Sequence, residues 1–454
     1  MRAAGVSKSL TGSAGLKTFA SDIDCRWVQL ALEHGDTAKL RNRKLPPEAV
    51  VWLVIGMALF RDHSIADVVR RLELVVPNRD GTAGRVVDGS IPKARTRIGD
   101  KPLRRLFELC SRSWAQSQAS EDSWRDLAVY AIDGTTLTLQ DTDENRQEFT
   151  LPRTGRGQSG YPKARLVALI AARSHLIVDA QIGPFAGKGK GETSLAAHLW
   201  DRVPSHSLTL MDRNFLDYAH LSRFTQVGHE RHWLLRLRKN SVIKNVRVLA
   251  DGDELGEVEI GRHVRRHDRT LPHKMDVRVI HYSFDGKPQR LMTSLLDPVR
   301  WPSEEVVAMY HERWEIEIAF DELKTYTLER RECLRSKHPM GVRQEIWGLL
   351  IAYNLIRRRM AMAAKKLKIQ ARGMSFVFSL RLIRAFLIAT AWQGSPANIP
   401  RHLAKLDQEL ESATLPARRP KRRYNRWVKV KMSGYKRNPC RPDKPPPSMN
   451  KALK

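Results

Sequence analysis

Four chemically active side chains recur at helical spacing in a stretch that reads YHERWEIEIAFDELK. Tyr310, Arg313, Glu317 and Lys324 lie at offsets of 0, 3, 7 and 14 residues within it. Because an α-helix turns by about 100° per residue, these side chains are expected within about 60° of one another on one face. That face would offer a carboxylate for a divalent metal ion and cations for a phosphate backbone. Phosphodiester cleavage needs both kinds of group.

Two further acids follow apolar segments that are typical of buried strands. Residues 127–133 read LAVYAID and end in Asp133, and residues 207–211 are followed by Asp212. Two strand-end aspartates and the helical Glu317 could hold two divalent ions about 4 Å apart. Three neighbouring carboxylates are costly unless metal ions neutralise them. A single strand-end acid often only caps a turn, so the prediction of a metal site depends on the combination.

The composition favours a polyanionic partner. The chain has 454 residues and 42% hydrophobic content, enough for a sizeable core and two to four domains. It carries 79 Lys and Arg against 49 Asp and Glu, a net charge of +30. Such an excess most often indicates a nucleic-acid-binding protein, and a merely basic soluble protein is the alternative.

Several classes of protein are disfavoured. The four cysteines are far apart and form no C-x-x-C pair, so neither a structural zinc site nor a disulfide framework is indicated. The first 20 residues show no signal peptide, and the longest apolar run, residues 49–60, is too short to span a bilayer. We therefore expect a cytoplasmic, nucleoid-associated protein with no membrane contact.

The elements that must position the acids follow the order strand, strand, strand, helix, strand. Between the strands that deliver Asp133 and Asp212, residues 165–171 and 175–181 form a hairpin-like pair, and residues 193–203 indicate a helix. This order matches an α/β fold of the ribonuclease H-like type. Its active site collects acids from adjacent central strands and from a later helix.

The rest of the chain divides around this core. Residues 1–118 are expected to form an N-terminal helical domain that binds the DNA end, with simple packing as the alternative. The catalytic domain is expected over residues 119–360, with an inserted, mainly β segment at about 227–300. Residues 361–454 are expected to form C-terminal helices and a basic tail, which is either solvated or in contact with DNA.

Three motifs give the chain a specific resemblance. The spacing Tyr310-x-x-Arg313-x-x-x-Glu317 followed by Lys324 matches the Tyr-Arg-Glu-Lys signature of the insertion sequence four family of DDE transposases. The stretches AIDGTT at residues 131–136 and MDRNF at residues 211–215 resemble the first and second aspartate motifs of that family. The resemblance covers about residues 20–360.

The resemblance implies a metal-dependent, cut-and-paste DNA transposase. Asp133, Asp212 and Glu317 would form the catalytic, metal-binding triad, with two Mg²⁺ or Mn²⁺ ions in each active site. The partners would be double-stranded DNA, both terminal inverted repeats and target, and a second copy of the chain in a synaptic homodimer. A displaced base could stack on Trp314, with Trp233 and Trp301 as weaker candidates. The side chains expected to contact DNA are Tyr310, Arg313, Trp314, Lys324 and Arg213.

Two rival functions stay open at this point. One is a ribonuclease H-like DNA nuclease without strand transfer, which the complete signature disfavours. The other is a catalytically inactive, transposase-derived DNA-binding protein, which the three intact acids disfavour. Glu192 could support the active site by contacting the residues that form it, although a surface carboxylate is the simpler interpretation.

Overall fold

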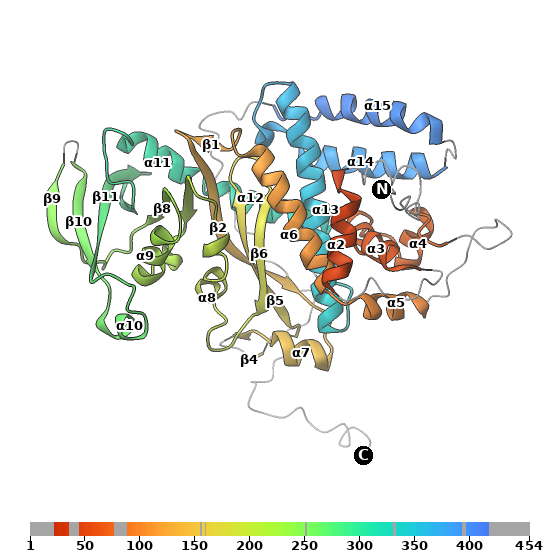
Figure 1. Ribbon diagram of the computed structural model, residues 1–454, viewed down its shortest axis with the longest axis horizontal. Coiled ribbons are helices and arrows are strands. Elements are labelled where there is room, and N and C mark those ends of the chain that lie inside the picture. The colour runs from red at the N-terminus through yellow and green to blue at the C-terminus, as the bar shows by residue number, and fades with distance from the viewer. Residues whose placement is uncertain are drawn as a thin grey trace, which may run out of the picture.

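The computed structural model describes residues 22–35, 45–76, 89–154, 157–158, 160–249, 252–329, 333–392 and 396–416. The protein is a mixed α/β structure in which helices and one large sheet lie side by side (Figure 1). The basic tail expected after about residue 416 lies outside the described residues. Within them, no helix is long and apolar enough to cross a membrane.

A ten-stranded sheet carries the two aspartates. Its strands follow the order β6-β5-β2-β7-β8-β12-β11-β10-β9, with the short β1 paired to β2. The first three are antiparallel, whereas β2, β7 and β8 run parallel. β7 is buried along its whole length and β2 over its first half, as expected for central strands covered on both faces. The bounds are β1 Ser123–Trp124, β2 Leu127–Thr138, β5 Lys163–Ala171, β6 Ile177–Pro184, β7 Ser207–Met211 and β8 Arg231–Arg236.

The segment expected as an insertion continues this same sheet. β12 (Lys287–Thr293) pairs antiparallel with β8, and β11 (Lys274–Phe284), β10 (Glu254–Glu259) and β9 (Lys244–Val248) follow outward. β8 falls inside the predicted insertion, yet it pairs in parallel with β7 and so lies in the row of strands that delivers the acids. Its apolar run indicated a strand but carried no information about its neighbour.

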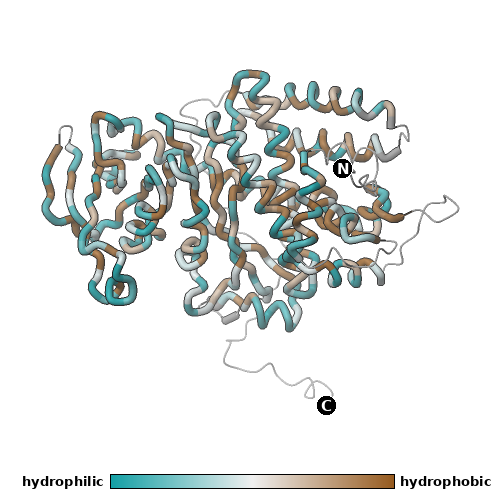
Figure 2. Tube along the Cα trace, in the orientation of Figure 1, coloured by the Kyte–Doolittle hydropathy of each residue, from teal (hydrophilic) through white to brown (hydrophobic). Residues whose placement is uncertain are grey.

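The N-terminal helices share one core with the C-terminal half of the chain (Figure 2). The predicted buried helix is α3 (Pro47–Leu59), in which every residue except Glu48 is buried. It crosses α13 (Pro339–Lys366) so closely that a Cβ on Gly348 would lie 2.6 Å from Val54. A buried ion pair of 2.6 Å between Arg61 and Glu345 joins the same two segments.

The remaining helices surround the sheet and α13. Residues 193–203, expected as one helix, form α8 and a separate 3-10 turn, η2, because the Leu199 amide bonds three residues back to Ala196 and tightens the chain. The other bounds are α2 Cys25–His34, α4 Ile65–Arg71, α5 Ser90–Ile98, α6 Lys101–Gln118, α7 Asp143–Phe149, α8 Glu192–Ala196, η2 Trp200–Arg202, η3 Arg213–Phe215, α9 Tyr218–Gln226, α10 Arg262–His267, α14 Phe376–Trp392 and α15 Ile399–Glu411. Two further short strands, β3 Arg153–Thr154 and β4 Gly157–Gln158, pair with each other.

The stretch expected as one helix from Tyr310 to Lys324 consists of three helical segments. They are α11 (Ser303–His311), α12 (Trp314–Asp321) and the π-helix η5 (Glu322–Thr327). A π-helical turn is rare and is frequent at functional sites. The wider turn changes the angular spacing of its side chains, so the 100° per residue assumed for the motif does not hold at Lys324.

A buried ionic cluster fixes the inner face of these segments. On η5, Glu322 accepts hydrogen bonds from the Tyr353 hydroxyl at 2.8 Å and from Arg357 Nε at 3.0 Å. On α12, the Glu315 carboxylate lies 2.9 Å from His175 Nε2, and the other ring nitrogen of His175 contacts Arg357. Because each buried acid has a charged or polar partner, the cluster anchors α12 and η5 to α13 and to the β5–β6 turn.

The Glu322 carboxylate gives the fold an acid-sensitive contact. Burial alone would raise its pKa, but Arg357 and His175 outweigh burial and lower the pKa to about 2. A carboxyl whose pKa is lower in the folded protein stabilises it above the unfolded pKa, and this contribution is lost as the pH falls towards 2. We expect Glu322→Gln to cost roughly 3–5 kcal/mol at pH 7, because Arg357 keeps a buried charge without its anion.

Urea unfolding at pH 7 and pH 3 measures this difference. The gap between wild type and variant should narrow at pH 3, whereas Glu304→Gln, at an exposed position of α11, should leave stability unchanged at both values. An equal gap at both pH values would contradict the role of the ionised carboxylate.

Candidate functional site

The register of two parallel strands brings the first two acids together. Ile132 of β2 is paired with Met211 of β7; Asp133 is the next residue of β2, and Asp212 directly follows the end of β7. Local turns hold both carboxylates. Asp133 accepts the Gly134 amide at 2.7 Å, and Asp212 accepts the backbone amide and the side-chain amide of Asn214 at 2.7 and 2.8 Å.

The environment of Asp133 disfavours the ionised form of its carboxyl group. Burial raises its pKa to about 6, and the negative charges of Asp212 and Glu192 act in the same direction. The Gly134 amide and the Arg313 guanidinium oppose this rise without cancelling it. A carboxylate in such a place is suited to bind a cation, because a cation would relieve both the burial and the repulsion.

Arg313 links the third acid to the first. Its guanidinium lies 3.7 Å from the Asp133 carboxylate and 2.8 Å from that of Glu317. The Arg313 side chain is only 12% exposed, whereas that of Glu317 is 42% exposed. The structure thus gathers Asp133, Asp212 and Glu317 at one place, with a guanidinium between two of them.

The other members of the helical motif also face this place. Burial raises the pKa of Tyr310 to about 12, with a further rise from the charge of Asp212. Lys324 Nζ lies 3.3 Å from the Thr135 hydroxyl, two residues beyond Asp133 on the same face of β2. The sequence motif therefore converges in space, although three helical segments rather than one deliver it.

The three tryptophans considered for base stacking differ sharply. Trp314 is 56% exposed, and Arg313 lies 5.4 Å from its ring centroid. Trp233 is completely buried and donates a hydrogen bond of 3.2 Å to Thr225, and Trp301 is buried as well. Only Trp314 presents a ring face to solvent among these three.

Glu192 has a closer relation to the site than its sequence context indicated. It lies on α8, pairs with Arg165 and packs against the backbone of β2 at Gly134. A Cβ on Gly134 would lie 2.5 Å from Glu192 Cγ, so glycine is the residue that permits this approach. A glycine directly after the first acid was the one signal in the sequence.

A basic groove of about 1330 Å³ begins beside the second acid. Its cations come from η3, the end of β8, the loop after β8 and the two strands β9 and β12, so no sequence window contains them. Glu259 is the acid in its lining, and it is paired with Lys244 at 2.9 Å. The lining cations are Arg213, Arg236, Arg238, Lys239, Lys244, Lys287 and Arg290.

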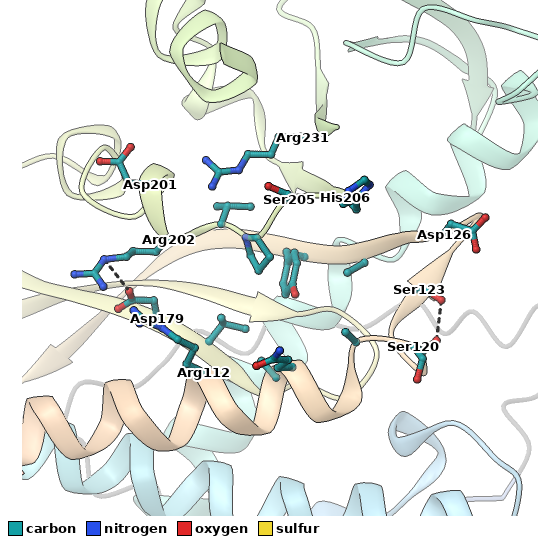
Figure 3. Close-up of a pocket in the computed structure, with 18 of the residues that line it drawn as sticks. Arg112, Ser120, Ser123, Asp126, Asp179, Asp201, Arg202, Ser205, His206 and Arg231 are labelled. Atoms are coloured by element: carbon teal, nitrogen blue, oxygen red, sulfur yellow. Dashed lines mark hydrogen bonds and ion pairs between the residues drawn. The ribbon is translucent and has the colours of Figure 1, made fainter. Parts of the chain in front are cut away.

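A second cavity, of about 920 Å³, lies apart from these residues (Figure 3). Ala128 and Tyr130 of β2 line it, and side chains alternate along a strand, so this face is opposite to that of Asp133. Its labelled charged groups mix both signs, with Arg202 3.9 Å from Asp179. We assign it no part in the candidate site.

The acids do not form a finished metal cage. Among the residues that the structure describes, no three His, Cys, Asp or Glu side chains are grouped closely enough to hold an ion. The Arg313 guanidinium is within ion-pair distance of both Glu317 and Asp133. The donors themselves, carboxylate oxygens, suit a hard divalent cation.

Comparison with known proteins identifies the family. Residues 13–108 match the insertion element 4 transposase N-terminal family, and residues 124–355 match the transposase DDE domain. The chain is 31% identical to transposase InsG for insertion sequence element IS4 of Escherichia coli (strain K12), over 92% of this chain and 93% of that protein. It is 33% identical to the putative transposase InsZ of the same strain, over 49% of this chain and 72% of that protein.

A solved structure of the piggyBac transposase synaptic complex with hairpin DNA aligns with a TM-score of 0.44 and 12% identity, over 89% of this chain and 86% of that chain. The two family matches define the class as transposases with a DDE domain. The chain belongs to the insertion element 4 family of that class, and it is an enzyme of DNA transposition. The resemblance found from the three sequence motifs is thereby confirmed.

The close approach at Gly134 yields a prediction. Gly134→Ala should lower the free energy of unfolding by about 1–3 kcal/mol, because the added methyl group must displace Glu192 or the strand. Gly160→Ala is the matched control, since a Cβ there meets nothing within 4 Å. Chemical denaturation of both variants measures the effect. Equal stability of the two would show that Glu192 moves aside freely.

Proposed function

We propose that this transposase cuts and rejoins DNA by a cut-and-paste reaction, with Asp133, Asp212 and Glu317 as its catalytic, metal-binding triad on a ribonuclease H-like core. The observation that carries the proposal is the bridge by which Arg313 ties Glu317 to Asp133, beside Asp212. The strand order supports the core assignment, since an antiparallel trio followed by two parallel strands places both aspartates on adjacent central strands.

The family of DDE transposases generally uses divalent metal ions, and the proposed ions are two Mg²⁺ or Mn²⁺. Asp133, Asp212 and Glu317 would hold them. When bound, such ions lower the pKa of an attacking water or hydroxyl and stabilise the oxygen that leaves phosphorus. The raised pKa of Asp133 supports the fit, because its charge has little compensation without a cation.

Cations and aromatic groups around the triad would position the DNA. The backbone of the transposon end would contact Tyr310, Arg313 and Lys324, and a displaced base would stack on the exposed ring of Trp314. Arg213 begins the basic groove, which would take the duplex away from the site. Joining two ends in one synaptic complex requires at least a homodimer.

The reaction would proceed in two displacements at phosphorus. Water attacks a phosphodiester at the transposon end, the P–O3′ bond breaks, and a 3′-hydroxyl is released. That hydroxyl then attacks a phosphorus of the target duplex, and the target's own 3′-oxygen leaves. Arg313 and Lys324 would balance the charge that develops on the non-bridging oxygens in both steps.

Removal of Glu317 or Asp212 should abolish DNA cleavage without abolishing DNA binding. Glu317→Ala and Asp212→Ala should each reduce cleavage of a duplex with the terminal repeats by roughly a thousandfold or more, yet leave binding of that duplex within about threefold. Glu304→Ala, six residues before Tyr310 on α11, is the matched control and should cleave normally.

Gel assays of cleavage, joining and binding with Mg²⁺ distinguish the rival functions. Cleavage without joining by the wild type would indicate a nuclease. Equal binding and no cleavage by all proteins would indicate an inactive DNA-binding protein. Full cleavage by Glu317→Ala would remove that residue from the proposed triad.

The Arg313 bridge predicts the metal affinity of the DNA-free protein. Arg313→Gln should bind Mn²⁺ about tenfold more tightly, because a fixed positive charge beside two carboxylates opposes a cation and competes for Glu317. Arg213→Gln removes an equal charge next to Asp212 and should change the affinity less. Isothermal calorimetry gives both values, and an unchanged affinity in Arg313→Gln would show that the bridge does not block the site.

A further inference from the structure

A short helix at the outer end of the sheet buries none of its side chains. α10 (Arg262–His267) lies between β10 and β11, beyond their ends in Figure 1, and is mostly hydrophilic in Figure 2, with Val264 as its one apolar residue. A helix of this length has little stability of its own, and most helices in proteins are held by a packed apolar face. α10 has no such face, so its place in the fold needs another explanation.

The two ends of the segment are anchored although the helix is exposed. Before it, Ile260 is buried, and after it, Leu271 packs with Ile260 and with Ala219 of α9 in a small apolar cluster. Asp268 accepts a hydrogen bond of 2.7 Å from Arg223 of α9. The segment is therefore fixed against α9 while its outward side chains are left in solvent.

The outward side chains are cations that repel one another. Arg262 and Arg266 are four residues apart on α10, and like charges at this spacing destabilise a helix. Arg269 lies two residues beyond the end of the helix and is also exposed. Within the described part of the chain, no carboxylate lies within ion-pair distance of these three arginines. The nearby Asp268 is already paired with Arg223. The repulsion among these arginines is unfavourable in the free protein, and it is relieved when a polyanion binds them.

The position of α10 connects it with the candidate site. Glu259, the last residue of β10, lines the basic groove, and so does Tyr218, which packs on the apolar cluster beneath α10. The groove begins at Arg213, next to Asp212. The cations of the groove and those of α10 thus lie on connected elements, because Arg262 follows Glu259 by three residues.

We propose that α10 and Arg269 hold the phosphate backbone of the DNA duplex where it leaves the groove, as a second contact outside the catalytic centre. The proposal rests on the proposed function, because it takes the groove as the path of DNA. Exposed arginines on a short helix and just beyond it, with no carboxylate in ion-pair distance among the described residues, fit backbone phosphates, which position a duplex without reading its sequence. The contact therefore adds affinity only for a duplex long enough to reach α10, and it adds no base preference.

The test compares the full-length wild type with the triple variant R262Q/R266Q/R269Q on a series of duplexes that extend stepwise to either side of the cleavage site. Wild-type affinity should rise once the duplex is long enough to reach α10, and the variant should lose that rise by tenfold or more. On the longest duplex, the slope of log affinity against log salt should fall by roughly 2 to 3 in the variant, about 0.9 for each phosphate contact. The matched control K365Q/K366Q/K368Q removes the same charge at the end of α13 and should keep the wild-type slope.

The outcomes separate this proposal from the proposed function. If the variant binds and responds to salt as the wild type does on every duplex, while Asp212→Ala still abolishes cleavage, α10 is not a DNA contact and the active site stands. If the variant loses cleavage of the shortest duplex as strongly as of the longest, α10 acts on the fold or the chemistry, which also overturns the proposal. If the wild type neither binds nor cleaves any duplex, the proposed function itself fails. Because α10 buries no side chain, the variant should unfold at the wild-type temperature.

Discussion

The cost of burying one carboxylate beside others is the constraint on which the rest of the site depends. Adjacent parallel strands bring Asp133 and Asp212 together, and burial makes the charge of Asp133 harder to keep, as its raised pKa shows. A compensating cation would favour the charged form of Asp133. Arg313 supplies part of the compensation from inside the chain, and it does so by holding Glu317 at the same time.

The helical segments that carry Glu317 meet this constraint by separating two kinds of acid. Glu315 and Glu322 face inward, where His175, Tyr353 and Arg357 satisfy them and make them structural. Glu317 faces outward, and its ion-pair partner is Arg313, one turn earlier in the chain. An acid with one exchangeable partner can change partners, whereas an acid in a saturated buried cluster cannot do so without great cost. This difference argues for a functional role of Glu317 and a structural role of its neighbours.

Much of the site was predictable because its signals are local. A buried run that ends in an acid gave Asp133, and the spacing of the helical motif gave Glu317 with Tyr310, Arg313 and Lys324. The α/β class and the buried α3 followed from hydrophobic periodicity in the same way. These features need only neighbours in sequence, which is what periodicity and motif spacing measure.

The features that were not predictable depend on partners distant in sequence. The π-helical turn at η5 is held by residues of α13, and the parallel pairing of β8 with β7 depends on register. The position of Glu192 against Gly134 depends on how α8 packs on β2. The basic groove joins cations from five elements, so a net charge of +30 indicated a polyanion but not where it would lie. Cations that are far apart in the sequence form one groove only because the sheet places β8, β12 and β9 close to Asp212. The pairing of the strands thus brings part of the chain's excess positive charge next to the candidate site.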